Sequence, residues 1–492
     1  MLNKAIVQLM ALGFVGTLAA TATAQDAGAL IDVMVRKGML KDQEAEQIRS
    51  QLSRDFAAQS SAGKLNLSSS VKELKLSGDV RARWQYDQLT NQQEQTTATP
   101  PVNNGNVTQR SRYRLRLRIN GDYQLNDNFF AGFGLQTENK PDSGNQTMAD
   151  TGATTPGGGF QNYNIYVSKA FIGWRPINAV TLIAGKQANP FYTTDMVWDA
   201  DINPTGFTQR VDLHKLLDLG GIEASLVAGQ FVLQDNAESA VVTGTGKSEA
   251  DARDAFLYQI QLQLTAPIAD GVKLTVAPGV IFNNGATVNP AGTVLVTGSL
   301  NALNSNESAV TLTPTGGTAG QRTLDGQTYI VAPGDVAFTV AGMKSKVLWD
   351  FSYNLQGGDR WDALVDTVML SKDGVTGAAL RGRVSSSDKT AALAGFQLGE
   401  NKKKGDWSLL ANYRYVGAVS VDPNINDSDW ALSKLNMHGP KVAFGYNLGD
   451  ATTLTLSYYS GNNIRKNLNS SSVGALDRNS VQVLQLDASV KF

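Results

Sequence analysis

Arginine occupies every second position of one short stretch of the chain: Arg110, Arg112, Arg114, Arg116 and Arg118. Guanidinium groups stay charged at physiological pH and bind carboxylates and phosphates through paired hydrogen bonds. Residues two apart on an extended strand share a face, so these five side chains, the arginine ladder, project together. Arg81 and Arg83 repeat the spacing upstream. The pattern indicates a basic wall that attracts and steers anions.

The residues between these arginines determine where such a wall can face. From Arg112 onward, the residues that alternate with the arginines are apolar: Tyr113, Leu115, Leu117 and Ile119. If this apolar face contacts lipid, the ladder faces the inside of a pore, since an arginine on the lipid side costs about 2–4 kcal/mol near the midplane. The arginine ladder then has two interpretations. It lines the pore and affects permeation, or carboxylates inside the pore neutralise it and it braces the wall.

The same two-residue period continues from Leu74 to Phe492. Short polar turns alternate with long polar segments such as 88–109, 190–204 and 418–439, as in membrane barrels with short periplasmic turns and long outer loops. A sheet that crosses lipid must close on itself because lipid satisfies no backbone hydrogen bonds. We therefore predict an all-β fold over 71–492, a transmembrane antiparallel β-barrel of about 16 strands.

The long segment 190–204 is the candidate constriction loop. Its distinctive residues are three carboxylates and one tryptophan: Asp195, Trp198, Asp199 and Asp201. Folded into the channel, the carboxylates would lie across from the arginines and create a transverse field at the narrowest point. The alternative is an ordinary solvated loop, and the Asp-rich stretch 422–429 is also interpreted as a solvated outer loop.

The N-terminal region has the features of an export signal. Lys4, the apolar run 5–19 and the small residues of 22–24 predict a signal peptide over 1–24. Residues 25–70 follow as a short periplasmic helical segment and linker, because apolar residues recur there at helical spacing. Residues 26–60 could join three barrels through a coiled coil, contact the cell wall or serve as a disordered tether.

Composition excludes several other classes. The chain has no Cys and two His, so we expect no metal, no cofactor and no enzymatic centre. The net charge of −1 gives no reason to expect a nucleic-acid partner. The last apolar strand ends in Phe492, which has the form of the assembly signal of outer-membrane barrels.

Three stretches resemble the putative porin family of Gram-negative outer membranes: 74–83, the 110–118 ladder, and 189–191 followed by 198–206. The resemblance is clear across about 70–235 and looser beyond. It implies a channel in the bacterial outer membrane, whereas the solutes of the family are mostly unassigned.

We therefore expect a porin for passive diffusion of small hydrophilic solutes or ions, with an arginine-lined constriction. The alternative is a non-conducting anchor or adhesin barrel. The expected partners are outer-membrane lipid and lipopolysaccharide, the barrel assembly machinery and, by analogy with sixteen-stranded porins, two further copies in a homotrimer.

Overall fold

The structure is a computed structural model. It describes residues 71–95, 102–138, 143–149, 162–234, 255–284, 326–367, 369–371, 382–465, 468–470 and 480–492, with Val35, Lys37, Ala45 and Ile48. Residues 71–492 form one compact unit and residues 1–70 another. The predicted signal peptide and all but four residues of the predicted helical segment lie outside the described residues, so both stay predictions.

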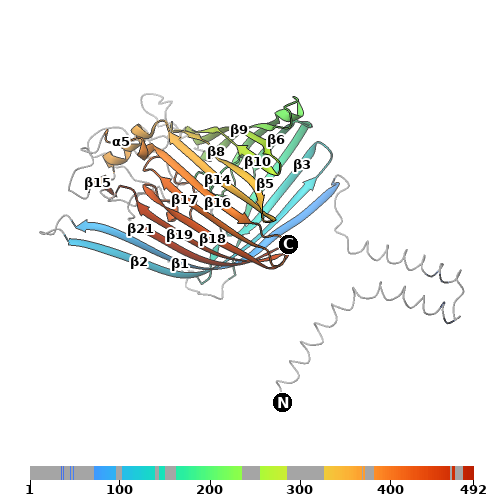
Figure 1. Cartoon of the computed structure of the whole chain (residues 1–492), viewed down its shortest axis with the longest axis horizontal. Coiled ribbons are helices and arrows are strands. Elements are labelled where there is room, and N and C mark those ends of the chain that lie inside the picture. Colours follow the sequence, from blue (N-terminus) through green and yellow to red (C-terminus); the bar gives the residue numbers. More distant parts are fainter. Residues whose placement is uncertain are drawn as a thin grey trace, which may run out of the picture. The chain divides into compact units, whose positions relative to one another are not determined.

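The described part of the second unit consists almost entirely of antiparallel strands (Figure 1). The strands are β1 (Glu73–Gln95), β2 (Val102–Gln124), β3 (Phe129–Thr137), β4 (Gln146–Thr147), β5 (Ile165–Ile177), β6 (Val180–Lys186), β7 (Thr205–Asp212), β8 (Glu223–Gln234), β9 (Ala255–Ala269), β10 (Val272–Val276), β11 (Gly279–Asn284), β12 (Thr328–Val331), β13 (Gly334–Val340), β14 (Met343–Asn354), β15 (Met369–Ser371), β16 (Thr390–Gly399), β17 (Trp407–Val416), β18 (Met437–Gly449), β19 (Thr452–Asn463), β20 (Leu468–Ser470) and β21 (Ser480–Lys491). The helical elements are α5 (Gly357–Thr367) and the 3-10 turns η2 (Leu213–Lys215), η3 (Ser387–Lys389) and η4 (Ala431–Ser433). No helix among these residues is long and apolar enough to cross a membrane.

The main sheet closes into a barrel because its first strand pairs with its last. β1 pairs with β2 on one edge and with β21 on the other, and both pairings are antiparallel. Figure 1 shows the blue and red strands side by side at this closing pair. The 19 segments of this sheet, all within the described residues, make a 16-strand barrel, since β10/β11 and β12/β13 are each one interrupted strand and β4 is a two-residue bridge. The predicted fold class is confirmed.

Turn lengths also follow the alternation expected from the sequence. Short turns join β2 to β3, β5 to β6, β9 to β10 and β13 to β14 at one end, called here the short-turn end. Gly271 supplies the φ of +68° that the β9–β10 turn requires, a conformation that glycine adopts without steric cost. The other end carries the long connections and is called the long-loop end.

One predicted loop is wrong in its extent. The segment 88–109 was expected to be a loop, but β1 and β2 stay paired from Glu73 opposite Gln124 to Gln95 opposite Val102. This part of the hairpin is rich in Gln, Asn and Thr on both faces, so it carries no apolar alternation. Hydrophobic periodicity detects a strand only where one face is apolar.

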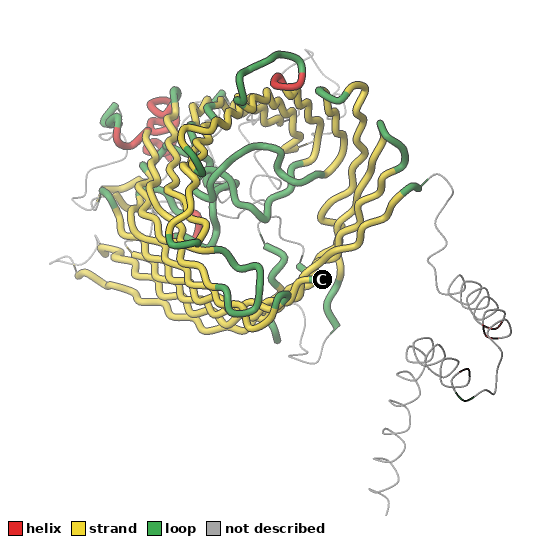
Figure 2. Tube along the Cα trace, turned by 45° about the vertical axis from the view of Figure 1, so that its right-hand side comes forward, coloured by secondary structure: helices red, strands yellow, loops and turns green. Residues whose placement is uncertain are grey.

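The apolar core of this barrel lies inside it, which the prediction of a polar lumen did not include. Loop segments fill part of the ring of strands (Figure 2). Buried apolar side chains from loops 187–204 and 417–436 pack on inward-facing residues at the long-loop ends of the strands, including Phe231, Leu257, Ile281, Tyr329 and Leu393. Where a loop covers the inner wall, that wall becomes an ordinary packed core.

Candidate functional site

The arginine ladder lies on β2, beside β1. In the register of this pair, Arg116 lies opposite Arg81 and Arg114 opposite Arg83. Like charges directly opposite one another destabilise a strand pair. Tyr113, between two ladder arginines, is 64% exposed on the outer face, so the ladder faces the interior. Such a wall requires carboxylates nearby.

Asp79 of β1 supplies the first of these carboxylates. Its Oδ2 lies 2.8 Å from Nη2 of Arg116, and its Oδ1 lies 2.6 Å from Nε of Arg118. One carboxylate therefore bridges two consecutive ladder positions. Charge-assisted hydrogen bonds of this length are among the stronger polar contacts in proteins.

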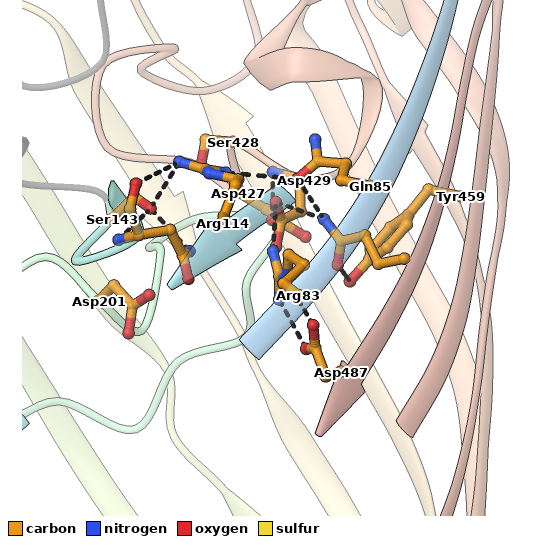
Figure 3. Close-up of polar contacts among 12 residues, drawn as sticks. Arg83, Gln85, Arg114, Ser143, Asp201, Asp427, Ser428, Asp429, Tyr459 and Asp487 are labelled. Atoms are coloured by element: carbon orange, nitrogen blue, oxygen red, sulfur yellow. Dashed lines mark hydrogen bonds and ion pairs between the residues drawn. The ribbon is translucent and has the colours of Figure 1, made fainter. Parts of the chain in front are cut away.

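Arg83 is neutralised across the closing pair of the barrel (Figure 3). Its Nε lies 2.7 Å from Oδ1 of Asp487 on β21, and its Nη1 lies 3.2 Å from Oδ2 of Asp429 in loop 417–436. Arg81 lies 3.7 Å from the same Asp487. The ion pairs thus link β1, β21 and a loop inside the barrel.

The remaining ladder arginines differ in their surroundings. Arg112 lies 3.0 Å from Oδ2 of Asp87. Arg114 is buried and donates hydrogen bonds to three neutral acceptors, which are Gln85 Oε1, Ser143 Oγ and the carbonyl of Asn145. Arg110, nearest the long-loop end, is exposed. The wall is therefore charge-balanced over most of its length and more open at its outer end.

Loop 187–204 reaches the ladder through one of its three predicted carboxylates. Oδ1 of Asp201 lies 2.9 Å from Nη1 of Arg118, and Oδ2 lies 3.4 Å from Nη1 of Arg116. The side chains of Arg118 and Asp201 remain 33% and 26% exposed. This pair is accessible within a set of largely buried ions.

The structure places Asp195 and Asp199 away from the ladder. Asp195 lies 2.7 Å from Nζ of Lys441 and 3.7 Å from Nη2 of Arg414. Asp199 accepts a hydrogen bond of 3.2 Å from the backbone N–H of Ser428. These two carboxylates fix the loop to other parts of the interior.

The rest of loop 187–204 is anchored to the wall by apolar and polar contacts. Trp198 is 3% exposed and packs edge-to-face on Phe231, with ring centroids 6.1 Å apart. The Tyr192 hydroxyl bonds Asp335, and the Thr194 hydroxyl donates a 2.5 Å bond to Asp350. Trp198 is thus part of the packed core and does not line open space.

Loop 417–436 also folds inward, which corrects the interpretation of 422–429 as a solvated outer loop. The backbone N–H of Asp199 donates to Ile425, and that of Asp427 donates to Asp195. Asp427 lies 2.8 Å from Nη1 of Arg414 and is buried. The acidic stretch therefore forms ion pairs with basic residues of the wall. The signal available in the sequence was the inward position of two basic residues, Arg414 on β17 and Lys441 on β18.

Charge and burial shift the pKa values of three carboxylates of these loops in different directions. Burial, with the charges of Asp427 and Asp201, raises the pKa of Asp199 well above its usual range. Burial acts in the same direction on Asp195, but Lys441 and Arg414 outweigh it and lower the pKa. Burial is likewise outweighed at Asp429, where Arg83, Arg114 and Arg81 lower the pKa.

Phe492 lies beside the closing pair of strands. Its backbone exchanges two hydrogen bonds with Gly78, of 2.9 and 3.1 Å. Its ring covers that glycine on the outer face, because a Cβ there would lie 2.5 Å from Cζ of Phe492. The residue is 61% exposed. A role as an assembly signal stays a prediction.

Within the described residues, no group of three or more His, Cys, Asp or Glu side chains could hold a metal ion. His214 contacts the Ala224 carbonyl, and His438 contacts Tyr413.

A closed barrel with a polar, ion-paired interior and loops folded inside it is typical of the β-barrel proteins of bacterial outer membranes. The family comparison makes this specific: the model for the family described as "Putative porin" matches residues 17–492. The chain belongs to this family, and the protein is a porin-like channel of the bacterial outer membrane.

Solved structures of outer-membrane proteins are similar to this chain at low identity. OmpF of Salmonella typhi, solved in complex with daunomycin, has a TM-score of 0.43 and 11% identity over 87% of this chain and 100% of that one. The channel DcaP of Acinetobacter baumannii has 0.40 and 13%, over 87% and 99%. An anion-selective porin from Comamonas acidovorans has 0.39 and 11%, over 85% and 99%. No curated protein matches the chain.

Proposed function

We propose that the protein is a porin for passive diffusion of small hydrophilic solutes or ions, and that the ladder and loop 187–204 form its constriction. The contact of Asp201 with Arg116 and Arg118 carries the proposal. It joins a loop inside the barrel to the basic wall, and both Arg118 and Asp201 keep accessible surface. Fixed charges at a narrow point act on passing ions.

The charges predict a weak preference for anions. Five arginines share five aspartates in ion pairs, and these arginines are Arg81, Arg83, Arg112, Arg116 and Arg118. The exposed Arg110 adds positive charge to this balance. The expected selectivity is therefore much weaker than seven uncompensated arginines would produce.

The test is the reversal potential of the refolded protein in a planar bilayer under a gradient of potassium chloride. We expect stepwise openings with a reversal potential on the anion side. Arg118→Gln should move it toward cations. Lys403→Gln removes the same charge from an exposed position between β16 and β17 and should leave it unchanged. Equal effects of the two variants would contradict the constriction.

A second candidate function is a non-conducting anchor or adhesin. The packed core inside the barrel favours it, because two loops and inward apolar residues occupy interior space at the long-loop end. A correctly folded barrel that never conducts in the bilayer would support this function over the porin.

The assembly of the protein completes the proposal. We propose that it forms a homotrimer surrounded by lipid and lipopolysaccharide, that Phe492 is read by the barrel assembly machinery, and that residues 26–60 contact the cell wall. Chemical cross-linking of whole cells tests the trimer and the cell-wall contact. Phe492→Ala should lower the amount of folded barrel in the outer membrane while the refolded protein conducts normally.

A further inference from the structure

Two phenylalanines face the interior at the short-turn end, beyond the Arg118 end of the ladder. Phe130 of β3 lies opposite Gly173 of β5, and Phe171 of β5 lies opposite Gly132 of β3. Phe130 and Gly132 share the inner face of β3 with Gln136, whose partner on β2 is Arg118, so Phe171 opposite Gly132 also faces the interior. The centroids of the two phenylalanine rings are 6.4 Å apart at 70°, and both side chains are partly exposed. Apolar ring surface left against a polar interior favours contact with another apolar group.

Each ring lies over a glycine of the neighbouring strand. A Cβ at Gly173 would lie 2.0 Å from Cζ of Phe130, and one at Gly132 would lie 2.5 Å from Cζ of Phe171. On the other side of Phe171, its partner on β6 is Gly185, with a φ of +116°. A Cβ there would lie 2.3 Å from the Ala170 carbonyl oxygen, so any side chain at this position would clash with the backbone of β5. Gly185 therefore presents no side chain beside Phe171.

Cations flank the two rings along the wall. The guanidinium of Arg175 lies 4.2 Å from the ring centroid of Phe130, toward the short-turn end. Lys169 follows Phe171 on the same face in the opposite direction, opposite Gly134. Asp122, opposite Gly132, is the one acidic side chain that the pairing of β2, β3 and β5 places at the level of the rings. The two flanking cations exceed it in charge.

We propose that Phe130, Phe171 and their flanking cations bind small solutes that carry a carboxylate on a planar aromatic ring. The inference rests on the proposed function, because the site lies on the wall of that channel. The solute ring stacks on Phe171 beside Gly185, in the offset or edge-to-face geometry that aromatic pairs prefer. Its carboxylate binds Lys169 or Arg175 through a charge-assisted hydrogen bond.

The experiment measures how four probes block chloride current through the refolded protein in a planar bilayer. Benzoate has both ring and carboxylate, acetate has the carboxylate alone, benzyl alcohol has an uncharged ring, and benzylamine has a cationic ring. We expect saturable block by benzoate at concentrations where the other three have little effect.

Variants separate stacking from charge. Phe171→Ala should weaken benzoate block about 2- to 12-fold, the range expected for loss of one aromatic pair, and Phe171→Tyr should retain it. The matched control is Phe133→Ala, because the Phe133 ring covers Gly121 in the same way on the outer face. Lys169→Gln should weaken block by benzoate but not by benzyl alcohol. Chloride current shows for each variant that the barrel has folded.

The inference is overturned if Phe171→Ala and Phe133→Ala behave alike, if acetate blocks as well as benzoate, or if benzylamine is the strongest blocker. A protein that never passes chloride contradicts the proposed function instead. Benzoate binding to that protein, measured by saturation-transfer NMR in detergent micelles with the same probes and variants, then decides the inference by the same comparisons.

Discussion

Two parts of the inner wall use the same strand geometry for different purposes. Along β1 and β2 the inward positions are charged and compensated by ion pairs, as at Arg83 and Asp79. At the long-loop ends of β8, β9 and β11 the inward positions are apolar and covered by loop residues, as at Phe231 and Leu257. The lumenal face of a barrel strand is therefore polar where it meets charge or water and apolar where a loop packs on it.

The two parts also differ in what stabilises them. Burying one large apolar side chain contributes about 1.5–3 kcal/mol. A buried ion pair contributes little relative to apolar residues of similar volume, although removing one partner is costly. The loop-covered wall thus supplies net stability, whereas the ladder wall fixes where charges lie.

The largest expected effect tests the ladder wall. Arg83→Met leaves Asp487 and Asp429 without this partner and should destabilise the barrel by about 3–5 kcal/mol, as for other broken buried pairs. The midpoint of urea unfolding in lipid vesicles measures it. Arg110→Met, the same change at an exposed ladder position, should stay within about 0.5 kcal/mol. Similar shifts for both would show that the ion pairs do not distinguish the positions.

A comparable effect is expected on the loop-covered wall. Trp198→Ala removes a buried ring from its contact with Phe231, and large-to-small changes of this kind cost about 3–5 kcal/mol. Loop 187–204 should become sensitive to protease in the refolded protein. Trp407→Ala, on an outward side chain that stacks on Phe444, is the control and should leave the loop protected. A protected loop in Trp198→Ala would argue against the packed core.

A smaller effect connects the two walls. Asp201→Asn weakens the contacts of loop 187–204 with Arg116 and Arg118, and as partly exposed ion pairs they contribute about 1 kcal/mol or less. It also uncovers positive charge, so the reversal potential should move further toward anions. Asp199→Asn, which acts within the loops, should move it less. If the reversal potential of Asp201→Asn does not shift, this carboxylate is not part of the constriction.

The last prediction concerns how the docking of loops 187–204 and 417–436 depends on pH, and its expected effect at neutral pH is the smallest. The pKa of Asp429 is lowered by Arg83, so its contribution is present above the usual carboxylate range and is lost as the pH falls through its folded value. The pKa of Asp199 is raised by burial and by Asp427, so its contribution is lost as the pH rises through its folded value. The protection of both loops against hydrogen exchange, relative to an unfolded chain at the same pH, should therefore be highest at intermediate pH. Asp199→Asn should abolish the loss of protection on the alkaline side, and a loss that persists would assign it to another group.

Most of the barrel could be predicted from the sequence because its signal is local. Alternation placed β2, β9, β14 and β17, and short polar turns fixed their order. The inward direction of the ladder followed from the apolar residues between its members. Each of these features depends on neighbours two residues apart.

The interior could not be predicted in the same way because its contacts join distant segments. Nothing local in 417–436 indicates that Asp427 meets Arg414 or that Asp429 meets Arg83. A weaker signal was present at the strand ends, where Phe256-Leu257-Tyr258 and Val280-Ile281-Phe282 are apolar on both faces. Loss of alternation at the long-loop end marks the wall that a loop covers.

The bond between Arg83 and Asp487 has a consequence for the order in which the barrel assembles. The two residues are 404 positions apart, on strands that become neighbours when the sheet closes. Until then one free edge of the growing sheet presents a guanidinium and the other a carboxylate. Opposite charges on two approaching edges attract and align them. The ion pair between Arg83 and Asp487 therefore forms only when β1 and β21 meet.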